Sequence, residues 1–147
     1  MRPNQLLAIS LPHAPLADPA VARACAAALR ASLGLRSLSP AEPAYQGRHR
    51  GGIAERDRAY HQGTVWPWLI GPYVQATTRT GGNAGGTVAS TLAGLEAHLR
   101  EWGPGSVSET AEGDPPHAAT GCPFQPWSVA ELLQARHLAR SNTRLGQ

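Results

Sequence analysis

Apolar side chains recur at helical spacing near the start of the chain. Asp18 is a good N-cap, Pro19 suits the first helical position, and Gly34 is a good stop. Between these ends the apolar positions fall three or four residues apart: Val21, Cys25, Ala28, Leu29 and Leu33. The pattern predicts a helix over residues 18–34 in which Cys25 is a small core residue and not a reactive thiol.

Two more helices are predicted in the middle of the chain, with a short turn between them. Residues 65–80 are apolar on most sides, which indicates a buried helix with a kink at Gly71-Pro72. Residues 81–86 are rich in glycine and predict a turn. The next helix is expected to reach Trp102, with apolar residues at three-and-four spacing: Val88, Leu92, Leu95 and Leu99.

The two ends of the chain carry shorter helical signals. Ser128 and Glu131 have the spacing of a capping box, which predicts the start of the last helix. Residues from 141 onward are polar, so we expect a frayed tail there. A short helical end is also expected near residues 4–10.

Long loops occupy residues 35–63 and 103–127, and the sequence has neither an alternating run nor a hairpin dipeptide between apolar strands. The predicted fold class is therefore all-α, with a single domain over residues 1–147. Each long loop follows one helix and precedes the next in the same sense, with one short turn between them. We expect the two loops to converge on one face and to build the functional site there.

Composition narrows the classes of function. The chain is 16% charged and 41% hydrophobic, and it has no apolar stretch long enough to span a bilayer. Its net charge is +3, but its arginines are scattered and it contains no lysine, so nucleic-acid binding is not favoured. We find neither a signal peptide nor a framework of paired cysteines, and therefore expect a soluble cytoplasmic protein with reduced thiols.

Candidate chemistry is densest in the segment YHQGTVWPW, residues 60–68. Sugar sites combine flat aromatic faces with amide or imidazole groups that hydrogen-bond hydroxyls. The segment supplies both kinds of group: Tyr60, His61, Gln62, Trp66 and Trp68. Residues two apart on a helix face different ways, so we expect one tryptophan in the core and one in the site, with Trp66 favoured for the site.

The second loop supplies carboxylates. A hydrolase needs one carboxylate as a base and a second group as an acid, and Glu109 is a candidate for the base. Glu112 and Asp114 lie in EGDPPH, which has the composition of a solvated turn. The histidines and cysteines lack the spacing of a zinc site or the setting of a cysteine nucleophile, so neither a metal nor a cofactor is expected.

Three motifs resemble the C-terminal part of the glycogen-debranching amylo-α-1,6-glucosidases. They are RPNQLLAISLP at residues 2–12, YHQGTVWPWLIGPY at 60–73 and SVSETAEGDPPHAATGCPFQPWSVAELL at 106–133. The resemblance covers nearly the whole chain, with the motifs in the same order. It implies an (α/α)6 barrel, of which this chain is the final third, with long loops that build a glucan site at one end.

The resemblance also implies roles for single residues. Glu109 takes the place of the family's general base, which activates water for attack on the anomeric carbon with inversion. His61, Gln62 and Trp66 would line the glucose subsite, and Gln125 matches the family's Gln-x-Trp-Ser motif before the last helix. Together with Asp57, Tyr60 and Trp68 they make up the candidate substrate-binding residues. Asp57 would bind a sugar hydroxyl or hold the loop, and Trp127 is assigned to packing.

The function that the resemblance implies is hydrolysis of α-1,6 branch-point glucose in glycogen or limit dextrin. The family's general acid is an aspartate that precedes the region matched here, so we expect an earlier segment of a larger enzyme as a partner. Two alternatives stay open. One is a non-catalytic glucan-binding or inactive fragment without the acid, and the other is a trehalase-like or glucoamylase-like hydrolase.

Overall fold

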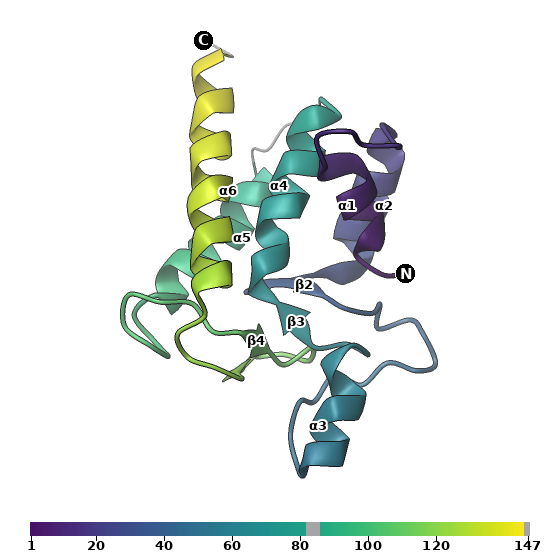
Figure 1. The fold of residues 1–147 in the computed structure, drawn as a ribbon, viewed down its shortest axis with the longest axis vertical. Coiled ribbons are helices and arrows are strands. Elements are labelled where there is room, and N and C mark those ends of the chain that lie inside the picture. Colours follow the sequence, from purple (N-terminus) through teal and green to yellow (C-terminus); the bar gives the residue numbers. More distant parts are fainter. Residues whose placement is uncertain (82–85, 146–147) are drawn as a thin grey trace.

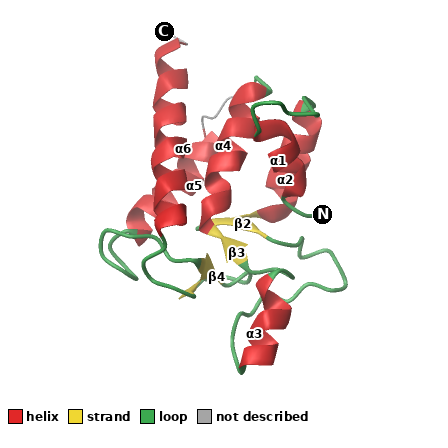
Figure 2. Cartoon of the chain, in the orientation of Figure 1, coloured by secondary structure: helices red, strands yellow, loops and turns green. Residues whose placement is uncertain are grey.

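The computed structural model describes residues 1–81 and 86–145. It consists of helices and short strands (Figures 1 and 2). The helices are α1 (Asn4–Ser10), α2 (Pro19–Leu29), α3 (Ile53–Tyr60), η1 (Pro67–Leu69, a 3-10 helix), α4 (Ile70–Arg79), α5 (Gly86–His98) and α6 (Pro126–Leu145). The strands are β1 (Arg30–Ala31), β2 (Gly34–Arg36), β3 (Val65–Trp66), β4 (Thr110–Ala111) and β5 (Ala119–Thr120).

Within the described residues the fold mixes helices with a small sheet. Five antiparallel strands pair in the order β1-β2-β3-β4-β5, and the sheet lies at one end of the helical layer, between that layer and α3 (Figure 2). The expected fold class, an all-α final third of an (α/α)6 barrel, is therefore wrong. Each strand has only two or three residues, too few to show an alternating pattern in the sequence.

Helix α2 begins as predicted but ends early. Asp18 caps it by accepting a 2.7 Å hydrogen bond from the Ala20 amide, and the helix stops at Leu29. The chain then turns back as the β1–β2 hairpin. A Cβ at Gly34 would lie 2.7 Å from the Trp66 carbonyl oxygen, so this glycine permits the close approach of β2 to β3 and does not end the helix.

Helix α4 occupies the middle of the helical layer, between α6 on one side and α1 and α2 on the other (Figure 1). Its buried face joins one hydrophobic core, whose largest fully buried apolar side chains are Leu6, Ile9, Leu29, Leu35, Val65, Ile70, Val74, Val88, Leu95 and Val107. Cys25 is also fully buried in this core, and burial raises its pKa. Both observations confirm the prediction that Cys25 is a core residue, because a buried thiol is not readily ionised.

Residues 65–80 form three elements and not the single helix predicted. The first two residues belong to β3, the next three form η1, and α4 starts at Ile70. Helix α4 runs through Gly71-Pro72 without interruption. Pro72 lies in the first helical turn, where its missing N–H breaks no helical hydrogen bond.

Helix α6 starts at Pro126, two residues before the predicted capping box. Ser128 therefore lies inside the first turn, and its buried hydroxyl has no hydrogen-bond partner in the part of the chain that the structure describes. Glu131 faces α4 instead. A Cβ at Gly71 would collide with its Oε2 atom, so the glycine lets the Glu131 carboxylate lie against the α4 backbone.

Other predicted boundaries also shift. Helix α5 ends at His98 and does not reach Trp102. Helix α6 continues to Leu145, so the fraying predicted from 141 does not begin there, and residues 146–147 lie outside the described residues. Most of the predicted turn, residues 82–85, is likewise outside them.

The loop over residues 35–63 contains a helix that the sequence analysis missed. Helix α3 projects from the sheet end of the molecule (Figure 1), and Ala59 is its buried residue. Its N-terminus is closed by a 2.6 Å hydrogen bond from the Gly52 amide to Glu55. None of the helices described in residues 1–81 and 86–145 is long and apolar enough to cross a membrane.

Candidate active site

The two long loops meet at Glu109, which confirms the predicted convergence. Glu109 directly precedes β4, and Tyr60 is the last residue of α3. The Tyr60 hydroxyl donates a 2.6 Å hydrogen bond to Oε1 of Glu109. Strands β3 and β4 pair through Val65 and Ala111, so the small sheet holds the two loops on the same face.

Backbone groups hold the other side of Glu109. Its Oε2 accepts a 3.0 Å hydrogen bond from the Cys122 amide, and its own amide donates to the Cys122 carbonyl at 2.8 Å. Gly121 makes room for this contact, because its φ is +71° and a Cβ there would lie 2.6 Å from Oε2. Each carboxylate oxygen thus faces a donor, an arrangement that suits an ionised carboxylate.

Tyr60 keeps its proton. Burial, together with the hydrogen bond to Glu109 and the charge of that carboxylate, raises the pKa of Tyr60 to about 12, because each of these disfavours the phenolate. Three other rings surround the phenol ring, with centroids 5.5 Å away at His49, 5.0 Å at His61 and 4.6 Å at Trp66. These contacts fix the position from which the hydroxyl reaches Glu109.

His49 is a site residue that the sequence analysis did not single out. Its Nδ1 lies 3.2 Å from Oγ1 of Thr120, which is 2.8 Å from Oγ1 of Thr110 across the β4–β5 pair. Burial and the positive charge of Arg56 lower the pKa of His49, against the smaller opposite effect of nearby carboxylates. The sequence showed only a histidine in a long loop, since the strand pairing that brings Thr120 to it was not predicted.

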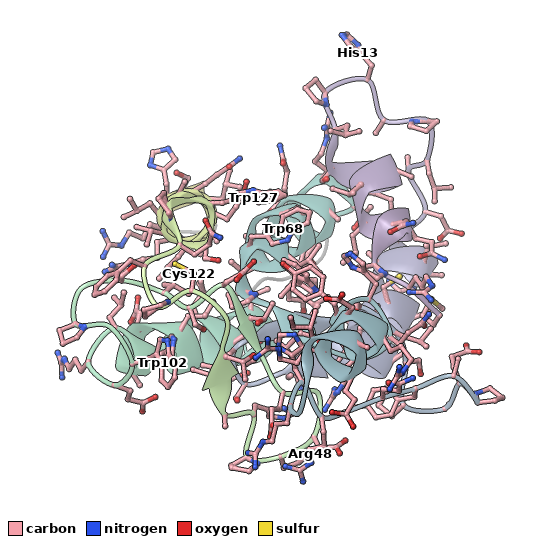
Figure 3. All side chains as sticks on the ribbon, turned by 60° about the horizontal axis from the view of Figure 1, so that its bottom comes forward. His13, Arg48, Trp68, Trp102, Cys122 and Trp127 are labelled. Carbon is pink, nitrogen blue, oxygen red and sulfur yellow. The ribbon has the colours of Figure 1, made fainter. Side chains whose placement is uncertain are left out.

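Trp66 and Trp68 line one pocket of about 380 Å³, together with His61, Trp127 and Arg2. The expected division into one core tryptophan and one site tryptophan is not observed, because both rings are half-buried, pack against the hydrophobic core and line the pocket. Trp66 lies on β3 and Trp68 in η1, so the two residues do not belong to one α-helix and the helical spacing argument does not apply to them. In this pocket Trp68 stacks against Trp127, with ring centroids 4.2 Å apart and planes at 21° (Figure 3).

His61 and Gln62 occupy different positions around this pocket. The His61 ring stacks on Trp66 at 5.6 Å with planes 7° apart, and it is exposed. Oε1 of Gln62 accepts a 2.8 Å hydrogen bond from Arg2, whose guanidinium also donates to the His61 carbonyl at 2.6 Å and the Ser37 carbonyl at 3.2 Å. Gln62 thus helps to hold the start of the chain against the site.

The remaining predicted site residues lie at the edge of this region. Asp57 is exposed on α3. Gln125 directly precedes α6 and is half-buried, with its amide donating a 3.1 Å hydrogen bond to the Val107 carbonyl. Tyr60, His61, Trp66 and Trp68 are therefore brought together, whereas Asp57 and Gln125 flank them.

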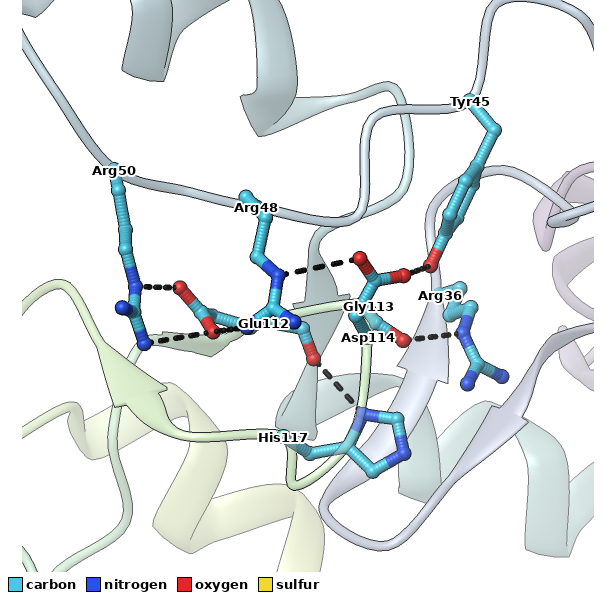
Figure 4. A network of polar contacts seen from close by, with 8 residues as sticks. All are labelled: Arg36, Tyr45, Arg48, Arg50, Glu112, Gly113, Asp114 and His117. Carbon is cyan, nitrogen blue, oxygen red and sulfur yellow. Dashed lines mark hydrogen bonds and ion pairs between the residues drawn. The ribbon is translucent and has the colours of Figure 1, made fainter.

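A second carboxylate cluster is built on Glu112 and Asp114, which follow Glu109 in the same loop (Figure 4). Glu112 is fully buried and accepts hydrogen bonds from Nη1 of Arg48 (2.9 Å) and from Nε and Nη2 of Arg50, the latter at 3.0 Å. Asp114 pairs with Nε of Arg48 at 3.3 Å and accepts a 3.1 Å hydrogen bond from Tyr45. The solvated turn predicted for EGDPPH is thus wrong at Glu112, which ties one long loop to the other.

The site offers few side chains suited to binding a metal ion or to acting as a thiol nucleophile. Within the described residues, no group of three His, Cys, Asp or Glu side chains is placed to hold a metal ion. Cys122 is exposed and free, and its Sγ lies 3.6 Å from the Phe124 carbonyl. Its contribution to the site is the backbone amide that binds Glu109.

Comparison with known protein families found a match. The profile of the amylo-alpha-1,6-glucosidase family matches residues 1–134, a region that includes Glu109, both long loops and the tryptophan-lined pocket. A comparison with curated proteins gave no match. Because the family match covers nearly the whole chain, this chain belongs to the amylo-α-1,6-glucosidase family.

Proposed function

We propose that this chain supplies the general base of an enzyme that hydrolyses α-1,6 branch-point glucose in glycogen or limit dextrin, with inversion of configuration. The observation that carries the proposal is the setting of Glu109, whose carboxylate accepts hydrogen bonds from the Tyr60 hydroxyl and the Cys122 amide. Membership of a glycoside-hydrolase-related debranching family supports the reaction class.

In the proposed step Glu109 takes a proton from a water molecule as the water oxygen attacks the anomeric carbon. The glycosidic bond breaks, and the leaving oxygen receives a proton from a general acid. The two carboxyl groups of an inverting enzyme lie roughly 6.5–9.5 Å apart, which leaves room for the water. Glu112 and Asp114 are both in ion pairs with arginines, so we assign the acid to an earlier segment of the complete enzyme.

The substrate side of the proposal rests on the groups around Tyr60. Parallel rings at His61 and Trp66 offer a flat face and an imidazole to a pyranose ring. The other proposed glucan-binding residues are Asp57, Gln62, Trp68 and Gln125. The proposed partners are a branched α-glucan and the acid-bearing segment, and the proposed location is the cytoplasm.

The proposal is tested with Glu109→Gln in the complete enzyme. Loss of the base should lower the rate of glucose release from limit dextrin by about 10²–10⁴-fold, while the Kd for the glucan stays nearly unchanged. Glu101→Gln is the matched control, because Glu101 is a well-exposed glutamate and should leave turnover unchanged. Near-normal turnover of Glu109→Gln would contradict the assignment.

Chemical rescue provides an independent check. Glu109→Ala leaves space for azide, which attacks the anomeric carbon without needing a base. Addition of azide should restore bond cleavage and yield β-glucosyl azide, the product of attack from the side opposite the α-linked leaving group. Formation of α-glucosyl azide would instead identify Glu109 as the acid/base residue of a retaining enzyme, because azide would then attack a covalent glucosyl-enzyme from the face that the leaving group had vacated.

Glucan binding without hydrolysis is the second candidate function. The tryptophan-lined pocket favours this function, because Glu109 is not among the described residues that line it. Isothermal titration with maltotriose and an assay of released glucose separate the two functions. Binding by the complete protein with no glucose released would support this second function and exclude the first.

A further inference from the structure

We propose that the stacked pair Trp68 and Trp127, with Arg2 and Asn4, forms a separate subsite for the glucan chain, next to the glucose on which Glu109 acts. The inference rests on the proposed function and extends it to a residue, Trp127, that sequence reasoning assigned to packing. It also brings the start of the chain into substrate binding.

The pair offers an aromatic surface to a pyranose ring. The indole rings of Trp68 and Trp127 stack at 4.2 Å, and Trp127 remains 51% exposed. Both rings line the pocket of about 380 Å³, which lies within the size range of small-molecule sites. About half of the surface of Trp127 is therefore accessible to a ligand in this pocket.

Trp127 is held in place before any ligand arrives. The Glu131 carboxylate, one helical turn further along α6, faces the Trp127 side chain, and it lies where a Cβ at Gly71 would be. The stack on Trp68 fixes the ring from a second direction. A ring fixed in this way loses little conformational entropy when a sugar stacks on it, which favours binding.

Polar groups lie on the same pocket wall. Among the described residues, the Arg2 guanidinium donates three hydrogen bonds: to the carbonyls of Ser37 and His61 and to the side chain of Gln62. A guanidinium has five N–H groups, so Arg2 has donors left for sugar hydroxyls. Asn4 is exposed at the start of α1 and also lines the pocket, which adds an amide that can both donate and accept.

The pocket is joined to the proposed base through one shared wall. Trp66 lines the pocket, and its ring contacts Tyr60 at 4.6 Å, whose hydroxyl binds Glu109. Glu109 itself is not among the described residues that line the pocket. The Tyr60–Trp66 pair therefore separates the two positions, and a chain that crosses it places one glucose at Glu109 and the next on Trp127.

The test uses Trp127→Ala in the complete enzyme, carried in the Glu109→Gln background for binding measurements. Loss of the Trp127 indole ring should raise the Kd for maltotriose about tenfold. Trp102→Ala is the matched control, because Trp102 is 47% exposed but lines a different pocket, and its Kd should not change. An unchanged Kd in Trp127→Ala, or an equal loss in both variants, overturns the inference.

Kinetics in the active enzyme separate this inference from the proposed function. Trp127→Ala should raise KM for a branched oligosaccharide about tenfold and leave the hydrolysis of α-glucosyl fluoride, a substrate with one glucose unit, unchanged. If the Glu109→Gln variant still hydrolyses α-glucosyl fluoride at the parent rate, the proposed function is wrong, whatever the result for Trp127→Ala. If Trp127→Ala and the parent enzyme have equal KM values for the branched substrate, the proposed subsite is wrong and the proposed function is unaffected.

Two further measurements keep the inference testable if Trp127→Ala does not fold. Glu131→Gln keeps an acceptor for the indole N–H and should bind maltotriose normally, whereas Glu131→Leu removes the acceptor and should bind it more weakly. In the unmutated protein labelled with 5-fluorotryptophan, maltotriose should shift the fluorine signals of Trp68 and Trp127 and leave that of Trp102 in place. A shift confined to Trp102, or no shift at Trp127, overturns the inference.

Discussion

A single hydroxyl group orients the proposed base. Tyr60→Phe removes the 2.6 Å hydrogen bond to Glu109 but keeps the phenyl ring among His49, His61 and Trp66. A hydrogen bond to a charged group contributes about 1.5–3 kcal/mol, so kcat should fall about 10–100-fold. Glucan affinity should change little because the ring contacts remain. Steady-state kinetics and isothermal titration on the complete enzyme measure the two quantities.

Tyr45 provides the control for this prediction. Its hydroxyl donates to Asp114 at 3.1 Å and not to Glu109, so Tyr45→Phe removes the same chemical group from the same loop. We expect kcat to stay near that of the parent enzyme. Equal losses of kcat in the two variants would show that Tyr60 acts through loop stability and does not position Glu109.

His49 gives the stability of the fold a pH dependence of definite sign. Burial and Arg56 lower its pKa below the ordinary value of 6.5, so as pH falls the unfolded chain takes up the proton first. The free energy of unfolding should therefore decrease as pH drops through 6.5, until the folded histidine is also charged. His49→Gln should reduce this decrease, as measured by urea unfolding between about pH 7.5 and 5.

His13 is the matched control, since it is an exposed histidine on the loop between α1 and α2. His13→Gln should leave the pH profile of the parent protein unchanged. A His49→Gln profile that is as steep as the parent profile would place the acid sensitivity in other groups.

At the scale of elements, the turn that follows β5 sets the position of Glu109. Gly121 has a φ of +71°, and a Cβ there would lie 2.6 Å from Oε2 of Glu109. Gly121→Ala should therefore push the carboxylate away from the Cys122 amide and lower kcat about 10–100-fold, the cost of one hydrogen bond to a charged group. The same kinetic assay on the complete enzyme measures the loss.

Gly105 provides a control that separates the effect of backbone strain from the effect of the collision with Glu109. It too has a positive φ, +84°, but a Cβ there would meet nothing within 4 Å. Gly105→Ala should destabilise the fold through strain alone and leave kcat unchanged. If the two alanine variants lose stability equally and also lose kcat equally, the space at Gly121 is not what holds Glu109.

The elements also show what the sequence can predict. The start of α2 was predicted because Asp18 and Pro19 are local signals that act on their own helix. The strands were missed because each takes its hydrogen bonds from distant segments, as when Leu35 pairs with Trp66. Local spacing carries no information about such partners, and a glycine such as Gly34 then looks like a helix stop although it serves a strand contact.

In the candidate site, too, some features could be predicted from local sequence and others depend on contacts between distant segments. Glu109 and Tyr60 were proposed from residue type and loop position, the resemblance singled out Glu109 as the base, and the convergence of the loops followed from the order of helices. The hydrogen bond between them depends on the sheet, and so does the shared pocket of Trp66 and Trp68. The burial of Glu112 could not be predicted, because its two arginine partners lie more than sixty residues earlier in the chain.

At the scale of the whole molecule, Glu112 connects the two loops that carry the site. Its side chain is 0% exposed, whereas Arg48 and Arg50 are 52% and 64% exposed. Either arginine alone can neutralise the buried carboxylate, so Arg48→Ala or Arg50→Ala should each cost about 1 kcal/mol or less. The double variant leaves Glu112 buried without a counter-charge and should cost about 3–5 kcal/mol, measured as the free energy of unfolding in urea.

Replacing the carboxylate itself decides whether charge is the cause. Adding Glu112→Gln to the double variant removes the unpaired buried charge, and it should recover part of the lost stability although it deletes one more ionic group. Such a recovery would be strongly non-additive, as expected for residues that share one network. If the three changes instead add up, the arginines stabilise the loops by packing and not by pairing with Glu112. The link between the two halves of the site would then depend on other contacts, among them the β3–β4 pair, the Tyr60–Glu109 hydrogen bond and the His49–Thr120 contact.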